Sequence, residues 1–291
     1  MGYNCEDLSW TEAKELFRVW RDDNERRSED IIELWENVLE DKVNKLGNEK
    51  FVILEQVVIA ALDCHRISLA EHCIVQLSLQ FPRSLRVLKL KAMILEAQER
   101  YDQALELLDT IIKRDETNSG PRKRRIAILE ARGRIPEAIK ELTEYLKRFM
   151  SDQEGWHELC NLYLQEQDYA KAAFCMEELV LHHPHNHLVH QRLAEIKYTQ
   201  GGHENMEIAR AYFLQALKLN SNNMRALYGV FLTSNNIATS QKCPAPKKKE
   251  ANKLMQWALS KIREKYAAVD KKNSSNVVAS LESMMASVQI N

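Results

Sequence analysis

The chain has 291 residues, of which 45% are hydrophobic and 29% charged, with only eight glycines and six prolines. This composition argues against disorder and favours an all-α protein whose helices have charged outer faces. The formal net charge of −1 provides no overall field that would attract nucleic acid or an anionic membrane. We therefore expect no nucleic-acid partner and only local contacts with other proteins.

The N-terminal sequence MGYNCEDLSWTEAKELF lacks the basic segment and apolar run of a signal peptide. The longest apolar stretch, residues 51–62, is interrupted by Glu55 and is shorter than the roughly 20 residues of a membrane-spanning helix. We therefore expect a soluble chain without a direct membrane span. Six cysteines without a CxxC motif favour a reducing cytosol, and Cys160 and Cys175 are expected to be small core residues.

Residues 1–50 predict an N-terminal helical cap. Ser9 and Glu12 form a capping box at the start of a helix over residues 9–24. A second helix is predicted near residues 28–46. Apolar residues recur at helical spacing in both segments, and they are Trp10, Ala13, Phe17 and Trp20 in the first and Ile32, Trp35, Leu39, Val43 and Leu46 in the second.

An alanine recurs every 34 residues from residue 70 onward and again after a three-residue insertion. These alanines are Ala70, Ala104, Ala138, Ala172 and Ala209, and they define units 51–84, 85–118, 119–152, 153–186 and 187–223. Each unit ends in a residue that can cap the following helix, and these are Ser84, Asn118, Asp152, Asn186 and Asn223. The pattern predicts helix pairs that cross closely at the alanine and bury their apolar faces by stacking on neighbouring pairs.

The unit at residues 153–186 resembles a tetratricopeptide repeat. The family's signature places are occupied by Trp156, Leu159, Tyr163, Tyr169, Ala172 and Pro184. Other units differ, since Arg122 and His190 replace the tryptophan while Glu116 and Met150 replace the proline. The resemblance implies a right-handed superhelical solenoid of five such repeats over residues 51–223.

Residues 224–291 predict C-terminal helices separated by an exposed loop at 239–250. One helix lies near residues 224–238, and the loop is indicated by proline, lysine and a lack of apolar periodicity. The helix expected over residues 250–268 places Leu254, Trp257, Ala258 and Ile262 on one stripe, and the segment 275–290 does the same with Val278, Leu281, Met285 and Val288.

Five histidines stand between residues 182 and 190, at the predicted joint between two helices. A zinc site needs three or four ligands that converge on one point, and neither cysteine nor carboxylate lies within this run. The run therefore favours a polar inter-repeat turn over a metal site. We predict no metal and no cofactor.

The basic run RKRR at residues 122–125 lies on a helix, where consecutive residues point in different directions. This spacing favours a solvated surface or salt bridges over a nucleic-acid patch. The motifs GxxxxGK[ST] and HExxH are both missing from the sequence. We predict no catalytic residues and no enzyme activity.

In tetratricopeptide-repeat proteins, positions 2, 5, 9 and 12 of each first helix line a groove that binds extended peptides. The implied contact residues are Arg86, Lys89, Met93 and Glu96; Lys123 and Glu130; His157, Asn161 and Leu164; Gln191, Glu195 and Tyr198; and Arg225, Tyr228 and Leu232. The alternative is a groove that is merely solvated. Met93 and Arg124 stand where chaperone-binding members carry asparagines, which argues against a chaperone adaptor.

Residues 152–202 and the following ARAYFLQALKLN resemble subunit 2 of the ER membrane protein complex, with weaker resemblance over nearly the whole chain. The inserted turn KYTQGG is the most specific part. That family is a non-catalytic scaffold, peripheral on the cytoplasmic face of the endoplasmic reticulum, in a complex that inserts tail-anchored and multipass membrane proteins.

The resemblance implies that the chain holds cytosolic tails of the membrane subunits and docks a second cytosolic subunit, number 8 or 9. Two alternatives stay open. One is a soluble peptide-binding adaptor outside the complex, and the other is an enzyme or metalloprotein centred on the histidines.

The alignment of the repeats can be tested at Ala172. An Ala172→Leu substitution should overpack the helix crossing and lower the free energy of unfolding by about 1 to 3 kcal/mol. Thermal unfolding measures this loss, and an unchanged melting temperature would contradict the alignment.

Overall fold

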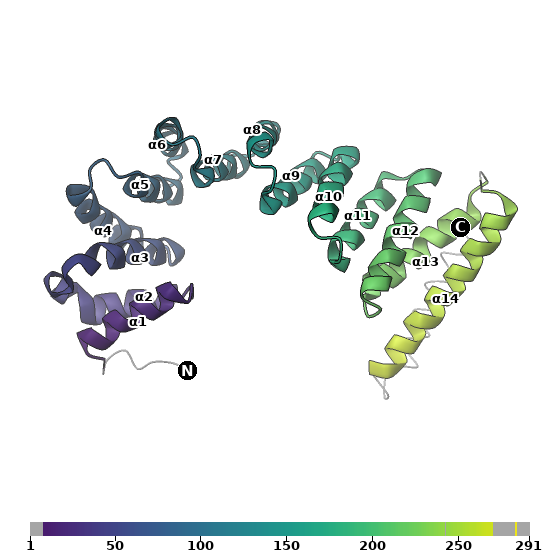
Figure 1. The fold of residues 1–291 in the computed structure, drawn as a ribbon, viewed down its shortest axis with the longest axis horizontal. Helices are drawn as coiled ribbons and strands as arrows, with labels where there is room; N and C mark the ends of the chain where they lie inside the picture. The colour runs from purple at the N-terminus through teal and green to yellow at the C-terminus, as the bar shows by residue number, and fades with distance from the viewer. Residues whose placement is uncertain (1–7, 242, 270–282, 284–291) are drawn as a thin grey trace. The chain divides into compact units, whose positions relative to one another are not determined.

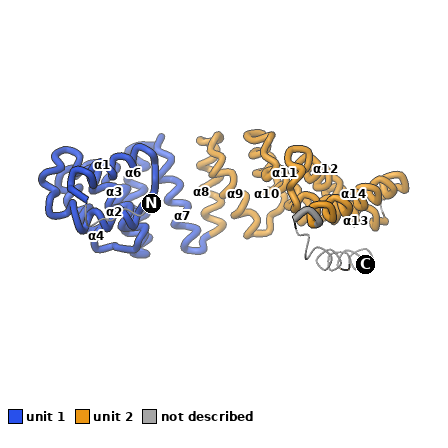
Figure 2. The backbone as a smooth tube through the Cα atoms, turned by 90° about the horizontal axis from the view of Figure 1, so that it is seen from below, with its two compact units in different colours: residues 1–134 blue, residues 135–291 orange. Residues whose placement is uncertain are grey.

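The computed structural model describes residues 8–241, 243–269 and 283, and these residues form helices without a β-strand (Figure 1). The chain divides into two compact units, residues 1–134 and residues 135–291 (Figure 2). The prediction of an all-α fold is therefore confirmed. Within the described ranges, no helix has the length and apolarity needed to cross a membrane.

The first unit begins with the predicted capping box. The Ser9 N–H donates to Glu12 Oε2 at 2.9 Å, at the start of α1 (Trp10–Asp22). The segment after it is less regular than predicted, since α2 (Ser28–Leu34) continues into a π-helical turn (Trp35–Leu39) and a 3₁₀ segment (Glu40–Glu49). The helix expected near residues 28–46 is therefore α-helical only as far as Leu34 and continues in π-helical and 3₁₀ form. Gly47, with a φ of 57°, turns the chain into the next helix.

The remaining helices follow the repeat pattern. In the first unit they are α3 (Lys50–Asp63), α4 (Ile67–Gln80), α5 (Leu85–Ala97), α6 (Tyr101–Arg114) and α7 (Ser119–Ala131). In the second unit they are α8 (Ile135–Arg148), α9 (Gln153–Gln165), α10 (Tyr169–His182), α11 (His187–Gln200), α12 (His203–Leu219), α13 (Met224–Thr239) and α14 (Ala245–Val269). The first helices α3, α5, α7, α9 and α11 begin within one residue of the predicted repeat boundaries.

All five repeat alanines are fully buried. Ala70, Ala104, Ala138, Ala172 and Ala209 each have 0% of their surface exposed. The apolar residues one turn later are buried as well, and these are Ile74, Leu108, Leu142, Met176 and Phe213. This burial agrees with the predicted register, because a small side chain allows the two helices to approach and the larger one fills the space beside the crossing.

Four of the five predicted helix caps form hydrogen bonds. The accepting side chains and their donors are Asn118 from Gly120 at 3.2 Å, Asp152 from Gly155 at 3.3 Å, Asn186 from Leu188 at 3.0 Å and Asn223 from Ala226 at 3.0 Å. Ser84 has the extended backbone of a cap, but its side chain accepts no cap hydrogen bond. The prediction of a side-chain cap is therefore wrong at Ser84.

The turn inside each helix pair contains a residue with a positive φ at the same repeat position. These residues are His65, Glu99, Gly133, Gln167 and Gly201, with φ between 55° and 75°. Only two of them are glycines, although a side chain makes the left-handed region unfavourable by about 1 to 2 kcal/mol. Glycine content alone could not have indicated this shared turn. The three non-glycine residues carry local strain that the repeat architecture imposes.

The C-terminal helix starts earlier than predicted. Residues 245–250, expected in the exposed loop 239–250, form the first turns of α14. Pro246 is the second residue of the helix, where a backbone N–H would have no partner within the helix, so proline is tolerated. Cys243 and Ala251 are buried together with Ile237 and hold the start of α14 against α13.

The apolar stripe predicted for this helix is partly confirmed. Ala258 and Ile262 are fully buried, whereas 42% of the Trp257 surface is exposed. The last predicted stripe, with Val278, Leu281, Met285 and Val288, lies outside the described residues.

The strained turns give a test of the fold. Replacing Gln167 by glycine should raise the free energy of unfolding by about 1 kcal/mol, because glycine adopts a positive φ without a steric penalty. The reverse change, Gly133→Gln, should lower it by a similar amount, since a Cβ at Gly133 would meet no atom within 4 Å and only the backbone would be strained. Chemical denaturation measures the free energy of unfolding of both variants, and changes of the same sign would contradict the strain assigned to these turns.

Candidate interaction surface

Ion pairs join consecutive first helices in the first unit. Arg86 of α5 binds Glu55 of α3 with an N to O distance of 2.6 Å. Arg124 of α7 binds Glu96 of α5 at the same distance. Burial raises the pKa of Glu96, while Arg124 opposes that shift. The predicted contact residue Glu96 is thus already bound within the chain.

The basic run at residues 122–125 lies on α7, and two of its side chains bind two different neighbouring helices. Arg124 binds Glu96 of α5, and Arg125 binds Asp109 of α6 at 2.8 Å. These side chains therefore form salt bridges on different sides of α7, and the run does not present one basic face. The salt-bridge interpretation of the motif is confirmed.

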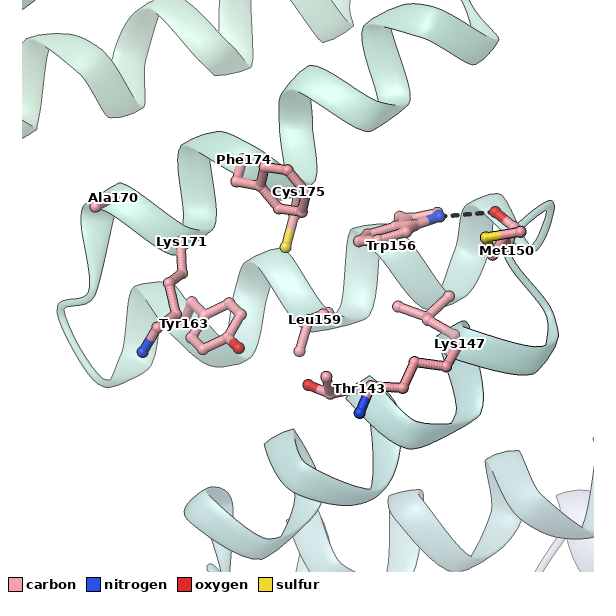
Figure 3. A pocket seen from close by; sticks show the side chains of 11 residues that line it. Thr143, Lys147, Met150, Trp156, Leu159, Tyr163, Ala170, Lys171, Phe174 and Cys175 are labelled. Atoms are coloured by element: carbon pink, nitrogen blue, oxygen red, sulfur yellow. Dashed lines mark hydrogen bonds between the residues drawn. The ribbon is translucent and has the colours of Figure 1, made fainter.

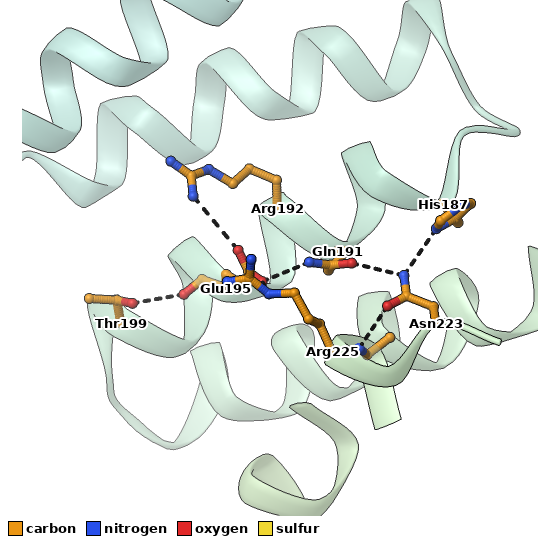
Figure 4. Close-up of polar contacts among 8 residues, drawn as sticks. His187, Gln191, Arg192, Glu195, Thr199, Asn223 and Arg225 are labelled. Carbon is orange, nitrogen blue, oxygen red and sulfur yellow. Dashed lines mark hydrogen bonds and ion pairs between the residues drawn. The ribbon is translucent and has the colours of Figure 1, made fainter. Parts of the chain in front are cut away.

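A network of polar side chains links α11 to α13 in the second unit (Figure 4). Asn223, the cap of α13, donates to Gln191 Oε1 at 2.8 Å and lies 3.0 Å from His187 Nδ1. Gln191 in turn donates to Glu195 at 2.8 Å, and Arg225 binds the same carboxylate at 3.3 Å. One asparagine therefore caps a helix and fixes its register on the preceding first helix.

The histidines of the 182–190 run have different partners. His183 Nε2 donates to Gln153 Oε1 at 2.5 Å, while His187 contacts Asn223. His190 is buried, donates to the Pro184 carbonyl at 2.8 Å and stacks on the ring of Tyr212. The predicted inter-repeat joint is confirmed. Within the described part of the chain, no three His, Cys, Asp or Glu side chains are grouped to hold a metal ion.

The surroundings of His157 on α9 disfavour its protonated form. Partial burial lowers the pKa of His157, and the neighbouring His183 and Arg192 lower it further because their positive charges repel an added proton. Arg192 is half exposed and approaches Glu195 only to 3.8 Å. Its guanidinium can therefore bind a further acceptor. Arg192 was not among the predicted contact residues, and its position in the repeat gave no signal for it.

The predicted contact residues differ in exposure. Arg86, Lys89, His157, Asn161 and Arg225 are exposed, and Met93, Glu96, Lys123, Glu130, Leu164, Glu195, Tyr198, Tyr228 and Leu232 are half-buried. Gln191 is 7% exposed and bonded within the chain, so it orients Glu195 and Asn223 and offers little surface to a ligand. The Tyr228 hydroxyl donates to that of Tyr266 on α14 at 3.2 Å, which ties α13 to the C-terminal helix.

Two cysteines of the second unit, Cys160 and Cys175, are deeply buried thiols. Burial raises the pKa of Cys160 to about 11 and that of Cys175 to about 12. Each has 1% of its surface exposed. A thiol with such a pKa is not ionised at neutral pH and is a poor nucleophile. Their predicted role as small core residues is confirmed.

The helix pairs with small residues at their crossings and capped joints define a tetratricopeptide-repeat protein. The structure is similar to the C-terminal part of a TPR repeat-containing protein from Cytophaga hutchinsonii, with a TM-score of 0.61 over 92% of this chain and 98% of that one. At 15% sequence identity this similarity shows the fold alone.

Sequence comparison defines the family. A family model described as the EMC2 TPR-like repeat domain matches residues 74–212. The chain is 48% identical to ER membrane protein complex subunit 2 of Xenopus tropicalis, over 98% of this chain and 96% of the relative. It is 29% identical to the subunit of that name in Dictyostelium discoideum, over 91% and 87% of the two chains. The chain therefore belongs to the family of ER membrane protein complex subunit 2.

The double role of Asn223 leads to a stability prediction. Asn223→Ala should lower the free energy of unfolding by about 1 to 3 kcal/mol, since it removes a helix cap and leaves the buried Gln191 without a donor. Ser84→Ala is the matched control, because Ser84 occupies a cap position without a side-chain hydrogen bond. Thermal melting compares the two variants, and equal losses would contradict the role assigned to Asn223.

Proposed function

We propose that this protein is a non-catalytic scaffold subunit of the ER membrane protein complex, positioned peripherally on the cytoplasmic face of the endoplasmic reticulum membrane. It holds cytosolic tails of membrane subunits and docks a second cytosolic subunit, number 8 or 9, in support of the insertion of tail-anchored and multipass proteins. The observation that carries the proposal is the 48% identity to a subunit of that name over 98% of the chain.

The chemistry of the first helices in the second unit supports a role in holding polypeptide. His157, Asn161 and Arg225 are exposed. They offer hydrogen-bond donors to backbone carbonyls or to acidic side chains of a bound segment. The half-buried Tyr198 and Tyr228 add aromatic surface, which suits the side chains of an extended peptide.

The internal bonding of the same helices supports a rigid platform. Gln191 and Glu195 are held by Asn223 and Arg225. A receptor whose side chains are already fixed loses less conformational entropy when it binds. Its partners can therefore be flexible tails that order on contact.

The proposal is tested by affinity capture of the tagged full chain from detergent-solubilised ER membranes. We expect recovery of several membrane-embedded subunits of the complex together with the second cytosolic subunit. Recovery of soluble proteins alone would defeat the proposal and would favour the adaptor alternative.

A charge reversal tests the contribution of the first helices of the second unit. Arg225→Glu should reduce recovery of the membrane subunits several-fold, because the Arg225 side chain is 77% exposed and its replacement reverses the charge offered to a bound tail. Lys140→Glu, an exposed charge on the second helix α8, is the matched control. Equal recovery with both variants at unchanged melting temperature would contradict the role of Arg225.

A further inference from the structure

A pocket of about 520 Å³ lies between α8, α9 and α10 of the second unit (Figure 3). None of its residues belongs to the contact set predicted from the repeat positions. The lining residues are Thr143, Leu146, Lys147 and Met150 on and after α8; Trp156, Leu159 and Tyr163 on α9; and Ala170, Lys171, Phe174 and Cys175 on α10. This volume is within the roughly 300 to 1,000 Å³ of the mostly apolar clefts that bind ligands in other proteins.

The floor and inner wall of the pocket are apolar and fixed. Leu146, Leu159 and Cys175 are at most 3% exposed. The Trp156 indole donates its N–H to the Met150 carbonyl at 2.9 Å, and the Phe174 ring meets it edge to face with centroids 6.2 Å apart (Figure 3). The polar atom of Trp156 is therefore satisfied by the chain, and its ring presents apolar surface to the pocket.

The rim exposes residues of the kind that form the centre of protein interfaces. Met150 is 68% exposed and Phe174 is 53% exposed. Methionine and aromatic residues are enriched at interfaces relative to the rest of the surface. An exposed pair of this kind beside an apolar pocket favours a partner that covers both side chains.

The charged lining residues of the pocket are both lysines. Lys147 on α8 lies 2.5 Å from Glu144, and Lys171 on α10 lies 2.7 Å from Asp168. Each of these pairs spans three residues on the surface, where an ion pair contributes little. An ammonium group has three N–H donors, so each lysine can also donate a hydrogen bond to a carboxylate of a partner. The pocket is thus apolar inside and has an ammonium group at two edges, while the carboxylates Glu144 and Asp168 that pair with these groups do not line it.

We propose that this pocket docks an acidic amphipathic segment of another protein, which packs a large apolar side chain against Trp156 and Phe174 and places carboxylates beside Lys147 and Lys171. The two lysines at the rim favour an acidic partner, and the apolar floor favours a leucine or an aromatic residue at its centre. This docking site is independent of the first-helix contacts, so the two proposals can fail separately.

The probe is a fluorescein-labelled peptide of sequence EEDFLDLLEE, titrated into the full chain and followed by fluorescence anisotropy. We expect saturable binding. A matched peptide with lysine in place of each acidic residue should bind at least tenfold more weakly, as should a peptide with alanine in place of each apolar residue. No saturable binding of the acidic peptide, or equal binding of the lysine peptide, would overturn the proposal.

Two variants test whether the acidic peptide binds in the pocket. Ala170→Trp fills the pocket from an exposed position, and the double variant Lys147→Gln, Lys171→Gln removes both ammonium groups without a charge reversal. Each should weaken binding of the acidic peptide at least tenfold with the melting temperature unchanged. Since one variant adds volume and the other removes charge, a folding defect in one leaves the other as a test.

The matched controls lie on the same helices. Leu181→Ala on α10 removes a side chain that is 75% exposed but does not line the pocket, and Lys140→Gln on α8 removes an exposed charge outside it. Both should leave binding unchanged. Equal effects of the control and pocket variants on peptide binding would overturn the proposal. Sedimentation would also overturn it if the unmodified chain formed dimers and only the pocket variants abolished them, because the occupant of the pocket would then be a second copy of this chain.

Discussion

The structure depends on the close crossing of two helices at a buried alanine, which recurs in every repeat. Ala172 and its four counterparts have no exposed surface, and the larger side chain one turn later closes the space beside each crossing. A helix pair of this kind leaves an apolar face that only a neighbouring pair can cover. Each unit therefore buries its apolar side chains in clusters that neighbouring pairs build together.

Two kinds of joint complete the repeats. Between pairs, a polar residue such as Asn223 caps the next helix and, in this case, also binds the preceding first helix. Within pairs, a residue with positive φ turns the chain, even where it is His65, Glu99 or Gln167. The packing of the alanine crossings stabilises the pairs enough to hold these strained turns. At the turns, packing therefore overrides the preference of non-glycine residues for a negative φ. At the caps, the preferred polar residues and the packing agree.

The first helices of the second unit and the pocket beside Trp156 differ in chemistry. The first helices of the second unit present polar and aromatic groups that are partly bonded to each other, such as Glu195 with Arg225. The pocket beside Trp156 presents an apolar floor with lysines at its edges. A scaffold that uses both could hold a flexible polar tail on one surface and an apolar anchor on the other, with no competition between them.

The helix pairs, their register and their family are readable from the amino-acid sequence, because a 34-residue period of small, large and capping residues specifies which positions are buried and where each helix begins. Three features emerged from the packing of the folded chain: Ser84 makes no cap bond, α14 begins at Ala245, and Gln191 is buried. The same packing also placed Lys147, Trp156 and Phe174 around one pocket. These features depend on contacts between different helices, and periodicity along one chain does not specify which outward-facing side chains meet.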